Sequence, residues 1–238
     1  MEIALLLLSV LIGGMIPFVY KAKEINYRYL LTFSGAYLLC ITVVHMLPEL
    51  FYEADSSLIV ISSFLLGGFF LQKVLELFSG GVEHGHVHVH SSFSPIVLVL
   101  SLCLHAFLEG TALSSVGHHH NHDHHGGHLL YGIILHKIPA AFALSSLLMA
   151  QGIKKRKHIT YLIIFALASP LGLFSINLLS DVLHGSITEY LFAIVTGNLL
   201  HIATTIFFES SPEHRLDKKK WFFLLLGVGL ALVAEFFG

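Results

Sequence analysis

Charged side chains are scarce in this sequence. They make up 12% of the 238 residues, while hydrophobic residues make up 55% and the mean hydropathy is +0.79. Soluble domains carry about twice that charged fraction. The composition therefore excludes an ordinary soluble domain and predicts an integral membrane protein.

Cysteine is scarce as well. Cys40 and Cys103 are the two cysteines, each lies inside an apolar run, and the chain has no Cys-x-x-Cys motif. This pattern excludes a disulfide framework. We expect both cysteines to act as small buried residues.

Long apolar runs occupy most of the chain and predict eight transmembrane helices. The first run, from Ile3 to Tyr20, lacks a basic leading segment and is long enough to span, so we expect a membrane helix and not a cleaved signal. The loops are too short for a soluble domain, so residues 1–238 are predicted to form a single all-α transmembrane domain. The predicted spans lie near residues 3–20, 28–51, 57–79, 94–117, 128–150, 159–181, 186–209 and 220–238.

Basic residues are confined almost entirely to the loops after spans 1, 5 and 7. Of the 13 Lys and Arg residues, only Lys73 and Lys137 lie elsewhere, and the loops after spans 2, 4 and 6 contain none. The positive-inside rule then makes the basic loops cytoplasmic and both termini extracytoplasmic. The basic residues of these loops are Lys21, Lys23, Arg28, Lys154, Lys155, Arg156, Lys157, Arg215, Lys218, Lys219 and Lys220.

Histidine is abundant, with 18 residues, and much of it lies in two loops. The loop at 80–93 is predicted to be cytoplasmic and the loop at 117–128 extracytoplasmic. Such tracts indicate loosely bound transition metal, although a solvated linker is the simpler alternative. The histidines are His84, His86, His88 and His90 in the first loop, and His118, His119, His120, His122, His124, His125 and His128 in the second.

Three ionisable residues inside the fourth and fifth spans predict a metal site at mid-membrane. His105 and Glu109 are four residues apart and share one helix face, and His136 lies in the next span. A buried carboxylate costs several kcal/mol unless it is paired or ligates a metal. Imidazole with carboxylate suits zinc and similar metals, while a His–Glu ion pair is the alternative. Water or Ser101, one turn before His105, could complete the ligand shell.

Lys137 adjoins His136 and limits how many ions the site can hold. Its ammonium group could replace a second metal, and it could pair with Glu109 when the metal is absent. We therefore predict one central metal ion. Pro139 is expected to kink the same helix, and His201 is expected to be a hydrogen-bonded core residue rather than a ligand.

A short repeated motif predicts two further metal-binding positions along the transport path. Span 2 ends with His45-x-x-Pro-Glu49, and span 7 ends with Glu209-x-x-Pro-Glu213-His214. The two spans run in opposite directions, so the motifs lie at opposite faces. This predicts an inverted repeat that relates spans 1–3 to spans 6–8 around spans 4 and 5. His45 and Glu49 would form the outer entrance, and Glu209, Glu213 and His214 the inner exit.

These motifs together resemble the ZIP family of divalent-metal transporters (Zrt/Irt-like proteins). The resemblance implies a ZIP-like bundle of eight transmembrane helices, commonly as a homodimer, in a plasma or bacterial inner membrane. It implies carriage of zinc, and in some members iron, manganese or cadmium, into the cytoplasm by an elevator-like motion. The matching segments are His105-Ala-Phe-Leu-Glu109-Gly110, His136-Lys137-Ile-Pro139, Pro170-Leu171-Gly172 and Glu209 to Glu213.

Departures from the family pattern concern a second metal position. Members with two metal ions use an Asn, a Glu and a further acid where this chain has Ala106, Lys137 and Ala140. Ser169 stands where some members carry an acid before the span-6 proline. The resemblance therefore implies the His-Lys branch, with Lys137 in place of the second metal.

Two other functions fit part of the pattern. An intramembrane metallohydrolase also buries His and carboxylate ligands, but the chain has no His-Glu-x-x-His motif and no Asp pair. A metal receptor or sensor would need the site without transport. We expect a carrier and not an enzyme, with divalent metal ions and the lipid bilayer as partners and no nucleic acid.

Overall fold

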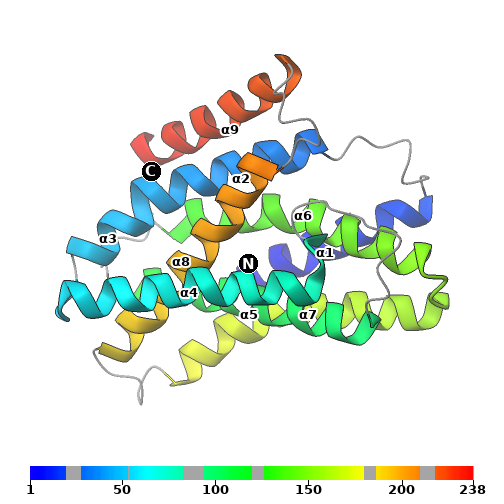
Figure 1. Cartoon of the computed structure of the whole chain (residues 1–238), viewed down its shortest axis with the longest axis horizontal. Helices are drawn as coiled ribbons and strands as arrows, with labels where there is room; N and C mark the ends of the chain where they lie inside the picture. The colour runs from blue at the N-terminus through cyan, green and yellow to red at the C-terminus, as the bar shows by residue number, and fades with distance from the viewer. Residues whose placement is uncertain are drawn as a thin grey trace.

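The computed structural model describes residues 1–19, 28–52, 54–82, 94–119, 126–179, 186–209 and 218–237, and all long elements in these ranges are helices (Figure 1). Eight of the helical segments are long and apolar enough to cross a membrane, as the sequence predicts. The elements are α1 (Glu2–Val19), α2 (Arg28–Ile41), the π-helix η2 (Thr42–Met46), α3 (Leu47–Tyr52), α4 (Leu58–Ser79), α5 (Pro95–His119), α6 (Gly126–Ala150), α7 (Lys155–Leu179), α8 (Ser186–Glu209) and α9 (Lys218–Phe237).

The second span differs from the single α-helix predicted for it. A π-helical turn, η2, separates α2 from α3, and the Leu47 N–H bonds to the Thr42 carbonyl oxygen. Pro48 follows directly and has no N–H to donate, so an ordinary α-helical ladder cannot continue through it. Such turns are frequent at functional sites, and this one contains His45.

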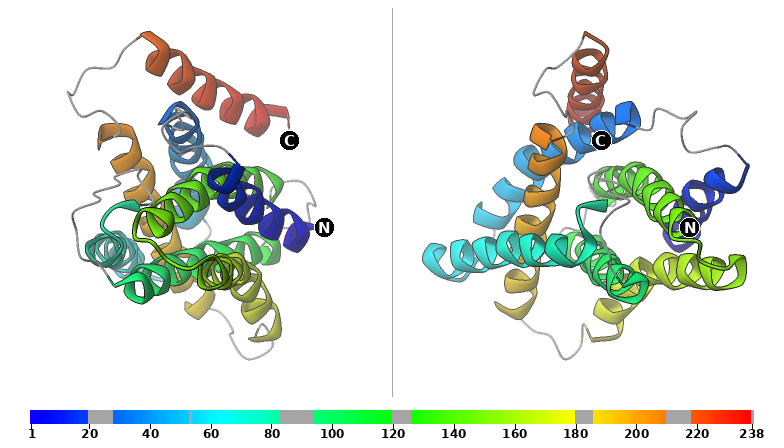
Figure 2. Two further views of the ribbon diagram at one scale, coloured as in Figure 1. Left: turned by 90° about the vertical axis from the view of Figure 1, so that its right-hand side faces the viewer. Right: turned by 45° about the vertical axis from the view of Figure 1, so that its right-hand side comes forward.

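The helices associate in two groups of four. In one group, α1 packs on α6 and α7, and α5 packs on α7. In the other group, α4 packs on α8, and α2 packs on α8 and α9. The groups meet where α5 contacts α4 and α8 and where α6 contacts α2. Figure 2 shows α9 at the periphery in both views, and its partner in the bundle is α2.

The pairing of helices has the symmetry that the inverted repeat predicts. Exchanging spans 1–3 with spans 6–8, and span 4 with span 5, converts the α1–α6 pair into α7–α5. The same exchange converts the α2–α9 pair into α8–α4. These four pairs make the most extensive contacts among the described helices. The symmetry therefore holds for the packing of the bundle and extends beyond the short motif in spans 2 and 7.

Glycine allows these pairs to approach backbone to backbone, and in two of them a glycine on each helix meets the backbone of the other. A Cβ atom on Gly68 of α4 would overlap the carbonyl oxygen of Ile194, and one on Gly197 of α8 would overlap that of Leu65. Gly110 of α5 and Gly172 of α7 face each other's helices in the same reciprocal way. In a membrane, where lipid is as apolar as leucine, such close packing is a main source of helix association.

A buried polar contact joins the three helices α1, α6 and α7. The Ser145 hydroxyl donates to the Gly14 carbonyl oxygen at 2.6 Å and accepts from His158 Nε2 at 2.8 Å. No role is predicted for His158 from the sequence. Its ring is 1% exposed and contacts the Phe18 ring. It therefore serves as a core residue of this helix group.

Adjacent glycines on α4 allow a matched test of the close packing. We expect Gly68→Ala to lower the free energy of unfolding by ~1–3 kcal/mol, because the new methyl group must displace the α8 backbone. Gly67→Ala is the control, since a Cβ there meets no atom within 4 Å. Thermal unfolding in detergent should separate the two variants, and equal melting temperatures would contradict the close contact.

Candidate metal centre

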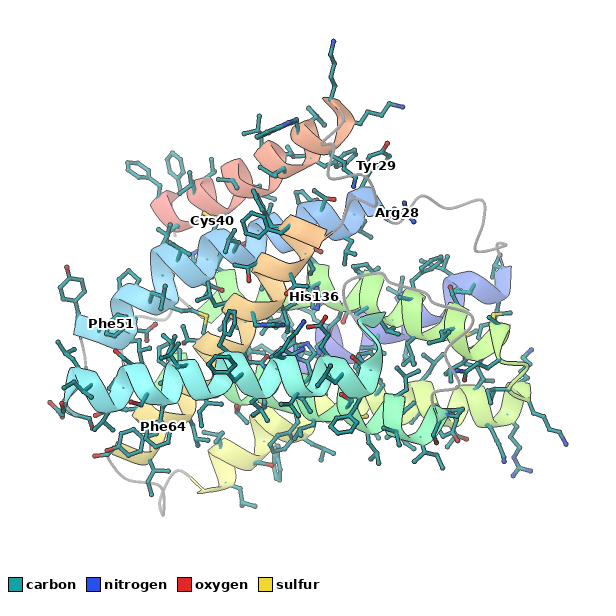
Figure 3. The ribbon with its side chains drawn as sticks, viewed as in Figure 1. Arg28, Tyr29, Cys40, Phe51, Phe64 and His136 are labelled. Carbon is teal, nitrogen blue, oxygen red and sulfur yellow. The ribbon has the colours of Figure 1, made fainter. Side chains whose placement is uncertain are left out.

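His105, Glu109 and His136 meet inside the bundle. The first two lie on α5 and the third on α6, and Figure 3 shows His136 near the middle of the molecule. The three side chains are 2%, 0% and 1% exposed. The four-residue spacing on α5 places His105 above Glu109 on one face, as the sequence predicts.

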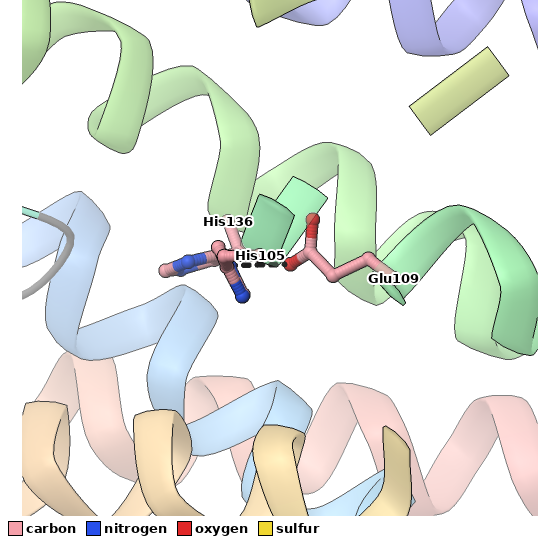
Figure 4. Close-up of side chains that lie close together, drawn as sticks. All are labelled: His105, Glu109 and His136. Atoms are coloured by element: carbon pink, nitrogen blue, oxygen red, sulfur yellow. Dashed lines mark ion pairs between the residues drawn. The ribbon is translucent and has the colours of Figure 1, made fainter. Parts of the chain in front are cut away.

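The donor atoms of these three side chains converge on one point (Figure 4). His105 Nε2 lies 3.2 Å from Glu109 Oε1, and the ring centroids of His105 and His136 are 6.1 Å apart. One ligand atom from each residue lies within 4.8 Å of the other two. No other group of three His, Cys, Asp or Glu residues in the described ranges has this geometry.

The convergence suits a tetrahedral divalent ion. Two ligands bound to one zinc at ~2.1 Å lie about 3.4 Å apart, close to the His105–Glu109 separation. Neither ring nitrogen of His136 has a hydrogen-bond partner among the described residues, although the ring is buried. Buried polar groups are otherwise nearly always hydrogen-bonded. A buried imidazole without such partners is therefore well suited to bind a metal ion.

Lys137 occupies the opposite side of the Glu109 carboxylate. Its Nζ lies 2.5 Å from Glu109 Oε2 and 5.6 Å from the centroid of the Phe165 ring. The pairing proposed from the sequence for the metal-free site is therefore present. Glu109 directs Oε1 towards His105 and Oε2 towards Lys137, so its two oxygens face different side chains.

Two serines considered near the site bond to backbone carbonyls. Ser101 donates to the Leu75 carbonyl oxygen at 2.6 Å, and Ser169 donates to that of Ala106 at 2.5 Å. Each hydroxyl therefore connects two helices in the structure.

His201 behaves as the core residue that the sequence predicts. Its Nε2 lies 3.0 Å from Glu76 Oε2, and Lys73 Nζ lies 3.0 Å from the same oxygen. The ring also contacts Phe69 edge-on. Glu76 thus has both a histidine and a lysine beside it.

Beside His45 and Glu49, the predicted outer entrance, the structure adds a residue that sequence reasoning missed. His45 Nε2 lies 3.6 Å from Glu49 Oε2, and His45 Nδ1 lies 2.8 Å from Oε1 of Glu235 on α9. The sequence does contain one signal for Glu235, which is a repeated spacing. Glu235 follows Gly227 by eight residues, as Glu76 follows Gly68. Each glutamate contacts a histidine on the helix beside it.

Several predicted ligands lie outside the part of the chain that the structure describes. The structure describes the helical backbone of Glu209, His118 and His119 but not their side chains. The other predicted ligands of this set lie entirely outside the described ranges. These are Glu213 and His214 of the inner exit and His84, His86, His88, His90, His120, His122, His124 and His125 of the two loops.

Comparisons with known proteins identify the family. The ZIP zinc transporter model matches residues 81–235, which is 155 of the 238 residues. This chain belongs to the ZIP family of zinc transporters. The matched region contains all three residues of the convergent site together with Lys137.

Individual relatives agree at modest identity. Zinc transporter ZIP9-A of Xenopus laevis is 28% identical over 216 residues, which cover 71% of this chain and 69% of the relative. Zinc transporter ZIP9 of Micropogonias undulatus is 33% identical over 140 residues, covering 50% and 43%. Zinc transporter ZIP1 of Danio rerio is 34% identical over 96 residues, covering 40% and 30%. The chain thus spans less than half of the last two relatives.

The Lys137–Glu109 pair can be tested through protein stability. We expect Lys137→Met to destabilise the metal-free protein by about 3–5 kcal/mol, because it leaves a buried carboxylate without its partner. Zinc should then raise the melting temperature more in this variant than in the wild type. Lys73→Met is the control, since Lys73 is half exposed and pairs with Glu76. An equal response to zinc in all three proteins would contradict the pairing.

Proposed function

We propose that this protein carries a divalent transition metal, with zinc as the main substrate, from outside into the cytoplasm. The observation that carries the proposal is the convergence of two imidazoles and a carboxylate, all fully buried, in a bundle of membrane-spanning helices. His105, Glu109 and His136 would bind the ion at mid-membrane. Membership of a family of zinc transporters supports zinc as the substrate.

The division into two helix groups supports an elevator-type mechanism. All three proposed ligands lie on α5 and α6, which belong to the group containing α1 and α7. This group could slide as a unit along α2, α4, α8 and α9, and thereby expose the bound ion first to one face and then to the other. The basic loops make the face after spans 1, 5 and 7 cytoplasmic, and both termini would then be extracytoplasmic.

The entrance and the exit would use the remaining His and acidic residues. His45 and Glu49, joined by Glu235, would receive metal at the outer face with the help of the His-rich loop at 117–128. Glu209, Glu213 and His214 would accept it on the inner side, together with the loop at 80–93. A homodimer in a plasma or bacterial inner membrane remains the expectation from the family.

Lys137 would restrict the central site to one ion. Its ammonium group pairs with the Glu109 oxygen that a second metal would need. In the proposed cycle the zinc would bind between His105, Glu109 and His136, and Lys137 would stay beside the carboxylate.

Uptake by reconstituted protein tests the transport function. Proteoliposomes with wild-type protein should accumulate zinc, and His105→Ala or Glu109→Ala should lower the rate at least tenfold through loss of a ligand. His201→Ala is the control outside the central site. A receptor or an intramembrane hydrolase would give no uptake by the wild type, and equal rates for all variants would contradict the proposed site.

The number of ions at the site is a separate measurement. Purified protein with both His-rich loops replaced by Gly-Ser linkers should bind one zinc ion tightly, as measured by native mass spectrometry or metal analysis. His136→Ala should remove that ion, because it deletes one of three protein ligands. Two tightly bound ions in the loop-replaced protein would contradict the proposed role of Lys137.

A further inference from the structure

A chain of buried amides reaches His105 from the opposite helix group. Asn198 lies on α8 and Gln72 on α4, and both side chains are 0% exposed. His105 Nδ1 lies 3.2 Å from Asn198 Oδ1, and Asn198 Nδ2 lies 2.8 Å from Gln72 Oε1.

The two hydrogen bonds together determine which nitrogen of His105 carries the proton. Asn198 uses its NH₂ group to donate to Gln72, so its carbonyl oxygen faces His105. A carbonyl oxygen only accepts, and His105 Nδ1 must therefore donate. The neutral ring then carries its lone pair on Nε2, the nitrogen that lies 3.2 Å from Glu109 Oε1.

This arrangement leaves two acceptors facing each other. The Nε2 lone pair and the Glu109 oxygen repel unless a proton or a cation lies between them. A metal ion at that point satisfies both, and the hydrogen bond at Nδ1 orients the ring and raises its basicity as a ligand. The amide chain thus prepares the ring for a cation before the ion arrives.

We infer that Asn198, held by Gln72, is a positioning residue for zinc binding. It fixes the tautomer and orientation of His105 and thereby raises the metal affinity of the central site. The inference rests on the proposed function of that site. It assigns a role to two neutral amide residues outside the group of His105, Glu109 and His136.

The hydrogen bond also connects the two helix groups. His105 belongs to the group of α1, α5, α6 and α7, whereas Asn198 and Gln72 belong to the group of α2, α4, α8 and α9. If one group slides along the other, His105 must leave Asn198. The site would then hold zinc more weakly after the movement than before it, which favours release on the far side.

Zinc affinity of purified, loop-replaced protein tests the inference. We expect Asn198→Leu, which has nearly the same shape but no acceptor, to raise the zinc dissociation constant 10- to 100-fold. Asn198→Asp keeps an acceptor towards Nδ1 and should restore most of the affinity. Thr196→Val is the matched control, since Thr196 is a buried polar residue of α8 whose hydroxyl donates to the Phe192 carbonyl oxygen.

A spectroscopic measurement separates positioning from a general packing defect. In ¹⁵N-histidine-labelled protein, the His105 resonances, assigned by their loss in His105→Ala, should show the Nδ1–H tautomer in the metal-free wild type. The Asn198→Leu variant should lose that signature, and Thr196→Val should keep it. A packing defect alone would lower the melting temperature without changing the tautomer.

The outcomes distinguish this inference from the proposed function. If the wild type binds and transports zinc but Asn198→Leu has wild-type affinity and tautomer, the inference is wrong and the proposed function stands. If the wild type neither binds nor transports zinc, both are wrong. Should Asn198→Leu fail to fold, Gln72→Leu leaves Asn198 in place but unanchored, and it should weaken zinc binding several-fold. Wild-type affinity in that variant would overturn the inference.

Discussion

Burial of the Glu109 carboxylate is the constraint on which the rest of this structure depends. An ionised group with no exposed surface in the middle of an apolar bundle needs a compensating partner on each side. Lys137 supplies this partner at Oε2, and the imidazoles of His105 and His136 stand beside Oε1, where a bound cation would supply the other. Burying any one of these residues alone in lipid would be unfavourable. Together they form a site that a bound cation would complete.

Close helix packing is what allows such a polar site to exist in a membrane protein. The glycines of α4, α5, α7 and α8 bring backbones into contact, so two helix pairs are tightly joined. Some of the polar contacts, such as His105–Asn198, cross the boundary between the two groups of helices. Close packing within each group and polar contacts between the groups are compatible with the sliding motion proposed above.

The sequence predicted the parts of this arrangement that depend on spacing and charge. The eight spans, the His105–Glu109 face, the proximity of His136 and the Lys137–Glu109 pair all follow from apolar run length, helical period and the cost of buried charge. The π-helical turn at His45 was not predicted, because hydropathy carries no information on whether a helix contains an extra residue in one turn. Asn198 and Gln72 were missed because neutral amides inside an apolar run look like ordinary helix residues. Glu235 was missed because a single acid near the end of the last span resembles a surface residue.

The Lys137–Glu109 pair has an electrical consequence. One positive and one negative charge make the empty site neutral overall, so the unloaded carrier would cross the membrane field at no electrical cost. In the proposed cycle the loaded site would carry both charges of the zinc ion. A potential that is negative inside would then favour loaded inward movement by about 4.6 kcal/mol per 100 mV, at roughly 2.3 kcal/mol per unit charge. A resident lysine would thus let the membrane potential drive uptake, while the return of the empty carrier stays independent of voltage.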